Sequence, residues 1–162
     1  MHWEPNRKAL ERRAALFFEG TENLGVEGCR FERLDGNAVM LSGYHRNASL
    51  IRNEVAWTGG TAFAGWGRTA EISDGGMHGY DGTGGDFPQH TLIEGNVIRE
   101  TGVFEKQSSC WFQAKTAQTT LRGNICFNLA RAGFNFVSAV AKIYDESMPP
   151  LFMTCVPSFV SE

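Results

Sequence analysis

A phrase of about a dozen residues recurs four times in this chain of 162 residues. Each copy has an apolar stub, a corner residue and a second apolar stub, and the copies are LGVEGCRFERLDG (24–36), SLIRNEVAWTGG (49–60), TLIEGNVIRETG (91–102) and TLRGNICFNLAR (120–131). The corner residues Cys29, Asn53, Asn96 and Asn124 are 24, 43 and 28 residues apart. A repeat of this length with short strand-like stubs indicates a solenoid in which each unit is one coil.

A further stub follows each phrase, and its apolar residues alternate. These stubs are NAVMLSG (37–43), TAFAGWG (61–67), SCWFQAK (109–115) and AGFNF (132–136), and AALFFEG (14–20) is the same stub one coil earlier. Period-two alternation predicts strands, with Val39, Leu41 and Phe63 facing inward. For SCWFQAK we predict Cys110, Phe112 and Ala114 inward, because the other register would bury Gln113. The outward row then includes Met40, Ser42, Ala64, Trp66, Trp111, Gln113 and Asn135.

These patterns predict an all-β protein, a parallel β-helix of four to five coils. Strands of successive coils would stack about 4.8 Å apart and pair in parallel. An asparagine at a tight corner tolerates left-handed backbone, and its amide can bond the coil above or below. The aligned Asn53, Asn96 and Asn124 therefore predict a ladder of side-chain amides, and the alternative is that each marks an ordinary turn.

The two ends of the chain depart from the repeat. NRKALERRA (6–14) is charged and rich in helix formers, so residues 1–13 predict a short helical cap before a β-helix at 14–136. Residues 137–162 form an atypical tail, which has no asparagine corner and carries three of the five prolines. The tail either folds over the last coil or ends a truncated rod.

Composition excludes several classes of protein. The net charge is −3 and no basic cluster is larger than RKALERR (7–13), which argues against a nucleic-acid partner. No apolar run reaches 18 residues, so no transmembrane helix is expected, and the first residues do not resemble a secretory signal. The four cysteines form no C-x-x-C motif, so we expect core thiols rather than a disulfide scaffold or a zinc site. Cys29 and Cys126 would lie three coils apart, about 14 Å, too far for a disulfide.

Four blocks of the sequence resemble a known family: FFEGTENLGVEGCRFERLDGNAVMLSGYHRN (17–47), DGTGGDFPQHTLIEGNVIRETG (81–102), FEKQSSCWFQAKTAQTTLRGN (104–124) and ARAGFNF (130–136). They are similar to large right-handed parallel β-helix proteins, loosely related to pectate-lyase-like and glycoside-hydrolase β-helices. The resemblance implies a right-handed β-helix and a secreted protein. The family has no firmly assigned chemistry. Its members continue with further coils after a block like AGFNF, so this chain resembles a truncated member.

The long insertion at 65–90, GWGRTAEISDGGMHGYDGTGGDFPQH, carries most of the candidate chemistry. Long loops on a rigid scaffold commonly carry function. A glycosidase needs two carboxyl groups about 5–10 Å apart, and a lyase needs a base and a charge stabiliser, often Ca²⁺. The predicted catalytic residues are Asp81, Asp86 and Glu105. The alternative is that these acids are turn residues, because Asp and Gly dominate turns.

Aromatic and polar residues near the insertion are candidates for holding a sugar. Outward tryptophans on stacked strands offer an apolar platform for the C–H face of a sugar ring, unless they pack beneath the insertion. The predicted substrate-binding residues are Trp66, His78, Tyr80, His90, Lys106, Trp111 and Gln113. DGTGGD (81–86) lacks the spacing of a P-loop or an EF-hand, so no metal site or cofactor is expected, and Ca²⁺ has no supporting motif.

The sequence therefore predicts a carbohydrate-active protein, a fragment of a β-helix that hydrolyses a polysaccharide, or cleaves it as a lyase, on the strand face beside 65–90. The alternative is a non-catalytic β-helix that binds glycans or serves as a surface module. The expected partner is a polysaccharide, and the chain is expected to be a monomer unless its exposed last coil self-associates. Only the family resemblance implies an extracellular location.

Overall fold

The structure, a computed structural model, describes residues 13–72 and 79–137. Every regular element in these two ranges is a β-strand, so this part of the chain is all-β. It contains no helix that could cross a membrane. The helical cap expected at 1–13 lies outside the described residues except for Arg13, which belongs to no regular element. The tail at 137–162 lies outside them except for Val137, the last residue of β16.

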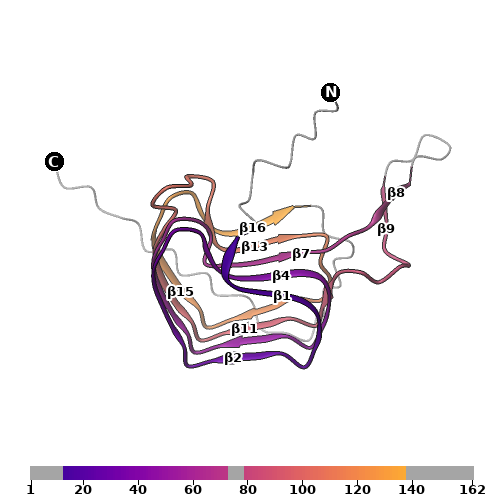
Figure 1. Ribbon diagram of the computed structural model, residues 1–162, viewed down its shortest axis with the longest axis horizontal. Helices are drawn as coiled ribbons and strands as arrows, with labels where there is room; N and C mark the ends of the chain where they lie inside the picture. The colour runs from indigo at the N-terminus through magenta and orange to yellow at the C-terminus, as the bar shows by residue number, and fades with distance from the viewer. Residues whose placement is uncertain (1–12, 73–78, 138–162) are drawn as a thin grey trace.

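Most strands belong to three parallel sheets (Figure 1). Sheet 1 runs in the order β1 (Ala14–Glu22), β4 (Asn37–Arg46), β7 (Phe63–Trp66), β13 (Ser109–Ala114) and β16 (Ala132–Val137), and β10 (Pro88–Gln89) also pairs with β4. Sheet 2 contains β2 (Gly25–Glu27), β5 (Ser49–Ile51), β11 (Leu92–Glu94) and β14 (Thr120–Arg122). Sheet 3 contains β3 (Arg30–Leu34), β6 (Glu54–Thr58), β12 (Val97–Thr101) and β15 (Ile125–Leu129).

The chain adds one strand to each sheet in turn, and we call each set of three strands a rung. The rungs are β2–β3–β4, β5–β6–β7, β11–β12–β13 and β14–β15–β16. The predicted alignment of the repeats is confirmed by the register, because Val55 pairs with Phe31 on one side and Ile98 on the other. The insertion leaves the second rung after β7, forms the antiparallel pair β8 (Ala70–Ile72) and β9 (Gly79–Asp81), and rejoins at β10.

The core fills the space between the three sheets. Val39, Leu41 and Phe63 are fully buried in one cluster, as predicted, together with Leu50 and Val55 from the other sheets. Burying side chains of this size stabilises the fold by roughly 1.5–3 kcal/mol each. Columns of equivalent apolar residues, one from each rung, therefore provide most of the favourable free energy of folding.

The predicted register of β13 is wrong for Phe112 and Ala114, although Cys110 does belong to the buried core cluster. Trp111 pairs with Phe63 and is fully buried in the core, whereas Phe112 lies on the outer face with Met40. Burying Gln113 costs little because its Oε1 accepts a hydrogen bond of 2.8 Å from Trp111 Nε1. Gly65 makes room for the indole, since a Cβ at that position would lie 3.0 Å from the ring.

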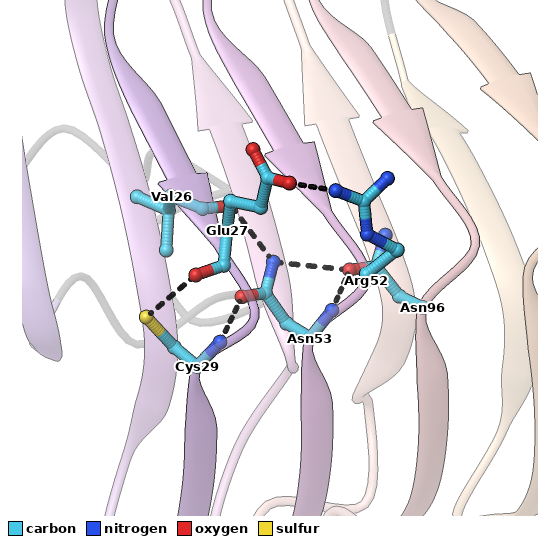
Figure 2. A network of polar contacts seen from close by, with 6 residues as sticks. All are labelled: Val26, Glu27, Cys29, Arg52, Asn53 and Asn96. Atoms are coloured by element: carbon cyan, nitrogen blue, oxygen red, sulfur yellow. Dashed lines mark hydrogen bonds and ion pairs between the residues drawn. The ribbon is translucent and has the colours of Figure 1, made fainter.

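The asparagine ladder is confirmed at the corner between sheets 2 and 3 (Figure 2). Asn96 Oδ1 accepts from Asn53 N at 2.9 Å and from Asn53 Nδ2 at 3.1 Å. Asn124 Oδ1 accepts in the same way from Asn96, at 3.0 and 2.9 Å. Asn53 Nδ2 also donates to Val26 O, and Asn53 Oδ1 accepts from Cys29 N. Each amide therefore joins its own rung to the next one.

The left-handed backbone at this corner belongs to the residue before each ladder position, not to the asparagine as expected. Gly28, Arg52, Gly95 and Gly123 have φ angles of 63°, 51°, 63° and 61°. Two further columns at the repeat spacing are also left-handed: Asn23, Asn47, His90 and Gln118, and Arg33, Trp57, Glu100 and Asn128. A single left-handed residue bends the chain sharply without a longer loop. Each rung therefore turns tightly at the same three places.

Two of the four cysteines form a disulfide, contrary to the expectation of core thiols. Cys110 in β13 is bonded to Cys126 in β15, with Cα atoms 6.4 Å apart. Cys29 is free and exposed. The bond connects sheet 1 of the third rung to sheet 3 of the fourth rung, so it constrains the last described rung.

Candidate functional site

Three charged side chains meet where the insertion leaves sheet 1, and we call them the Arg68 cluster. Arg68 forms ion pairs with Glu19 of β1 and with Asp86, the latter at 3.4 Å. All three side chains are about half exposed. Gly43 lies beneath them: a Cβ there would be 2.9 Å from both Arg68 Nη1 and Asp86 Oδ1. A side chain at position 43 would therefore displace the ends of the Arg68 and Asp86 side chains.

Arg68 joins the two carboxylates of its cluster. One guanidinium contacts both carboxylates, so Glu19 and Asp86 lie next to the same cation. The hydrogen bond to Glu19 is the main reason that the pKa of Arg68 is raised, and Asp86 adds to the effect. Arg68 is thus a fixed cation between Glu19 and Asp86.

Arg46 holds the end of the insertion against sheet 1. Its guanidinium donates to Phe87 O at 2.8 Å and to Gly85 O at 2.9 Å, and it lies 4.3 Å from the centre of the Tyr44 ring. Tyr44 Oη donates to Glu22, and this hydrogen bond is the main reason that the pKa of Tyr44 is raised. Asp86 lies between Gly85 and Phe87, so the hydrogen bonds from Arg46 to these two residues fix its position.

The predicted catalytic residues do not all meet. Asp86 belongs to the Arg68 cluster, whereas Glu105 precedes the N-terminal end of β13 and lines a groove with Asp35. The stretch of β4 between these places, Asn37 to Gly43, is roughly 20 Å long at the rise of an extended strand. Asp81 ends β9, and its side chain lies outside the described residues.

The predicted substrate-binding residues are dispersed as well. The prediction that Trp66 and Trp111 form one outward platform is wrong. Trp111 is in the core with Gln113, whereas Trp66 packs on Phe112 on the outer face of sheet 1. The ring centres of Trp66 and Phe112 are 5.7 Å apart. Lys106 lies in the groove beside Glu105. The two remaining described positions are His90, exposed at a corner, and Tyr80, whose backbone alone is described; His78 lies outside the described residues.

Sequence reasoning missed Glu19 and Arg68. A signal for Glu19 was present: aligning AALFFEG (14–20) with the next two stubs puts Glu19 beside Ser42 and Trp66, where the insertion begins. Nothing in the sequence pattern pairs Arg68 with Glu19, since their contact depends on how the insertion folds back. Within 13–72 and 79–137, no group of three or more His, Cys, Asp or Glu side chains could hold a metal ion.

Comparison with known proteins gives no assignment for this arrangement: no family model, no curated protein and no solved structure matches the chain. Function is therefore inferred from the residues of the chain and from their geometry.

Proposed function

We propose that this chain is a right-handed parallel β-helix of a carbohydrate-active protein, and that it binds and hydrolyses a polysaccharide at the Arg68 cluster. The winding is supported by the three parallel sheets that the chain visits in turn and by the ladder of Asn53, Asn96 and Asn124. Crossovers between parallel strands are nearly always right-handed, which supports the handedness.

The observation that carries the proposed reaction is the bridging of Glu19 and Asp86 by one guanidinium. One carboxyl group would protonate the leaving oxygen of the glycosidic bond, and the other would activate water or attack the sugar. Because the pKa of Arg68 is raised, Arg68 is a poor proton acceptor, which favours hydrolysis over a lyase reaction with Arg68 as the base. Asp81 remains a further candidate acid from the same insertion.

The test is the release of reducing ends from pectin, xylan and mixed-linkage glucan by the parent and by single variants. We expect Glu19→Gln and Asp86→Asn each to lower turnover by about 10²–10⁴-fold, the usual contribution of a catalytic acid or base. Glu27→Gln is the matched control, because Glu27 is also an exposed acid paired with an arginine, Arg52 at the corner after β5. Parent-like turnover by both variants, with melting temperatures unchanged, would exclude Glu19 and Asp86 from the reaction.

The second candidate function is glycan binding without cleavage. It is favoured by the ion pairs that both carboxylates form with Arg68. Together the three groups offer hydrogen-bond acceptors and donors to the hydroxyl groups of a sugar. It requires that the parent releases no reducing ends from any of these polysaccharides, and that Arg68→Ala weakens their binding in affinity electrophoresis.

An extracellular location is part of the proposal. The disulfide between Cys110 and Cys126 supports it, because disulfides persist in oxidising compartments and are rare in the cytosol of most organisms.

A further inference from the structure

A groove of about 610 Å³ lies at the end of sheet 1 away from the Arg68 cluster. This volume is within the roughly 300–1,000 Å³ of small-molecule sites. Its lining residues come from the start of the described chain, the corner before β4, the corner before β7 and the segment before β13: Arg13, Asp35, Gly36, Gly59, Phe104, Glu105, Lys106 and Gln107.

The segment before β13 is held in place by backbone hydrogen bonds. The N–H groups of Phe104 and Glu105 both donate to Gly59 O, at 3.2 and 2.8 Å. Lys106 Nζ donates to the carbonyls of Gly102 and Val103, at 3.0 Å each. The wall of the groove is therefore formed before any ligand arrives, which lowers the entropic cost of binding.

Phe104 is the apolar surface of the groove. Its side chain is 71% exposed, the largest fraction among the exposed large hydrophobic residues of the described chain. The ring lies against Gly59, where a Cβ would be 2.8 Å from Phe104 Cδ2. Its remaining surface faces solvent, beside the half-exposed Val103. An exposed aromatic ring fixed on a rigid backbone is suited to stacking on a flat, partly apolar ligand.

The charges around Phe104 balance. Asp35 and Glu105 oppose Arg13 and Lys106, and the Lys106 ammonium is already bound by two carbonyl groups. An anionic ligand would therefore meet two carboxylates without a compensating excess of cations. A ligand with hydroxyl groups would find acceptors in both carboxylates, and Gln107 adds an amide that can donate and accept.

We propose that this groove, called the Phe104 groove, is a second glycan-binding site that takes a neutral oligosaccharide. A sugar ring stacks on Phe104 through its C–H face, and its hydroxyl groups bond to Asp35, Glu105 and Gln107. The Phe104 groove is separate from the Arg68 cluster and does not depend on catalysis there.

Isothermal titration calorimetry of the full chain with β-1,4-linked hexasaccharides of glucose, xylose and mannose tests the proposal, with hexagalacturonate as the acidic probe. We expect at least one neutral probe to bind, Phe104→Ala to weaken it by about tenfold or more, and Phe104→Trp to retain it. Phe136→Ala is the matched control, because Phe136 is a similarly exposed phenylalanine, 53% accessible, in β16. It should bind like the parent.

Three results would overturn the proposal: no heat from any neutral probe, unchanged binding by a folded Phe104→Ala variant, or tighter binding of hexagalacturonate than of every neutral probe. The variants Glu19→Gln and Asp86→Asn separate this site from the proposed reaction. They should retain calorimetric binding in the Phe104 groove whether or not they release reducing ends.

Discussion

His45 is a buried residue whose charge links the stability of the fold to pH. Its ring is fully buried at the end of β4, and Nδ1 accepts from Thr21 Oγ1 at 2.7 Å. Nε2 lies 3.1 Å from Ser42 O and 3.2 Å from Phe18 O, so the neutral ring with a proton on Nε2 satisfies every contact. Burial lowers the pKa of His45 below its usual 6.5. The hydrogen bonds to Ser42 O and Phe18 O and the charge of Glu19 oppose this shift, and Arg46 adds to it.

This lowered pKa gives a pH dependence of known sign. The unfolded chain binds a proton on His45 below pH 6.5 more readily than the folded chain does, so the free energy of unfolding should fall as the pH falls below about 6.5. Urea unfolding at pH 7.5 and 5.5 measures the loss. His45→Gln should reduce it, while His90→Gln, at an exposed corner, should not. An equal loss in parent and His45→Gln would show that His45 is not its source.

Contacts between side chains explain why the sequence predicted some of the inward-facing residues correctly and others incorrectly. Alternation correctly placed Val39, Leu41 and Phe63 in the core. It failed for SCWFQAK, because the inward register depends on a bond between Trp111 and Gln113 and on the space left by Gly65 in the neighbouring strand. No single-strand pattern contains that information.

At the scale of elements, the asparagine ladder holds successive rungs together at one corner. Asn96 is fully buried and makes contacts in both directions: it accepts from Asn53, and its Nδ2 donates to Leu50 O at 2.9 Å and to Asn124 Oδ1. Three sheets with strands of only three to six residues in the later rungs need such lateral bonds, because each short strand alone makes few ladder bonds.

Removing one member of the ladder should be costly. Asn96→Ala leaves Asn53 N–H and Leu50 O without their buried partners, so we expect a loss of about 3 kcal/mol in the free energy of unfolding. Guanidinium unfolding measures it. The control is Asn135→Ala in β16, outside the ladder, for which we expect a change within about 0.5 kcal/mol. Equal losses in the two variants would mean that the ladder adds no stability of its own.

The disulfide should stabilise the last two described rungs. It closes a loop with a sequence separation of 16 residues between Cys110 and Cys126, for which the entropic effect is about 3 kcal/mol. We expect Cys126→Ser to lower the free energy of unfolding by about that amount, and Cys29→Ser, at the free exposed thiol, to leave it unchanged. Unfolding of both variants and the parent under non-reducing conditions gives the comparison. A Cys126→Ser variant as stable as the parent would refute the effect.

The elements also divide into those that sequence reasoning could predict and those that it could not. The phrases around Asn53, Asn96 and Asn124 predicted the register of sheets 2 and 3, because equivalent residues of a stacked repeat must pair. The site was predicted only through Asp86. Glu19 and Arg68 are 49 residues apart and meet only when the insertion returns to sheet 1.

For the whole molecule, the three-sheet scaffold places two polar regions at opposite ends of the sheet 1 strands. The insertion with β8 and β9 extends beyond the C-terminal ends, next to the Arg68 cluster. The Phe104 groove lies before the N-terminal ends.

The most direct test of the proposed function is a double-variant comparison of turnover on the polysaccharide that the parent cleaves fastest. If Glu19 and Asp86 form one catalytic pair, Glu19→Gln combined with Asp86→Asn should be about as slow as the slower single variant, because groups that act as a unit are not additive. Losses that multiply would contradict a single acid pair bridged by Arg68, and parent-like turnover in the double variant would exclude the cluster from the chemistry.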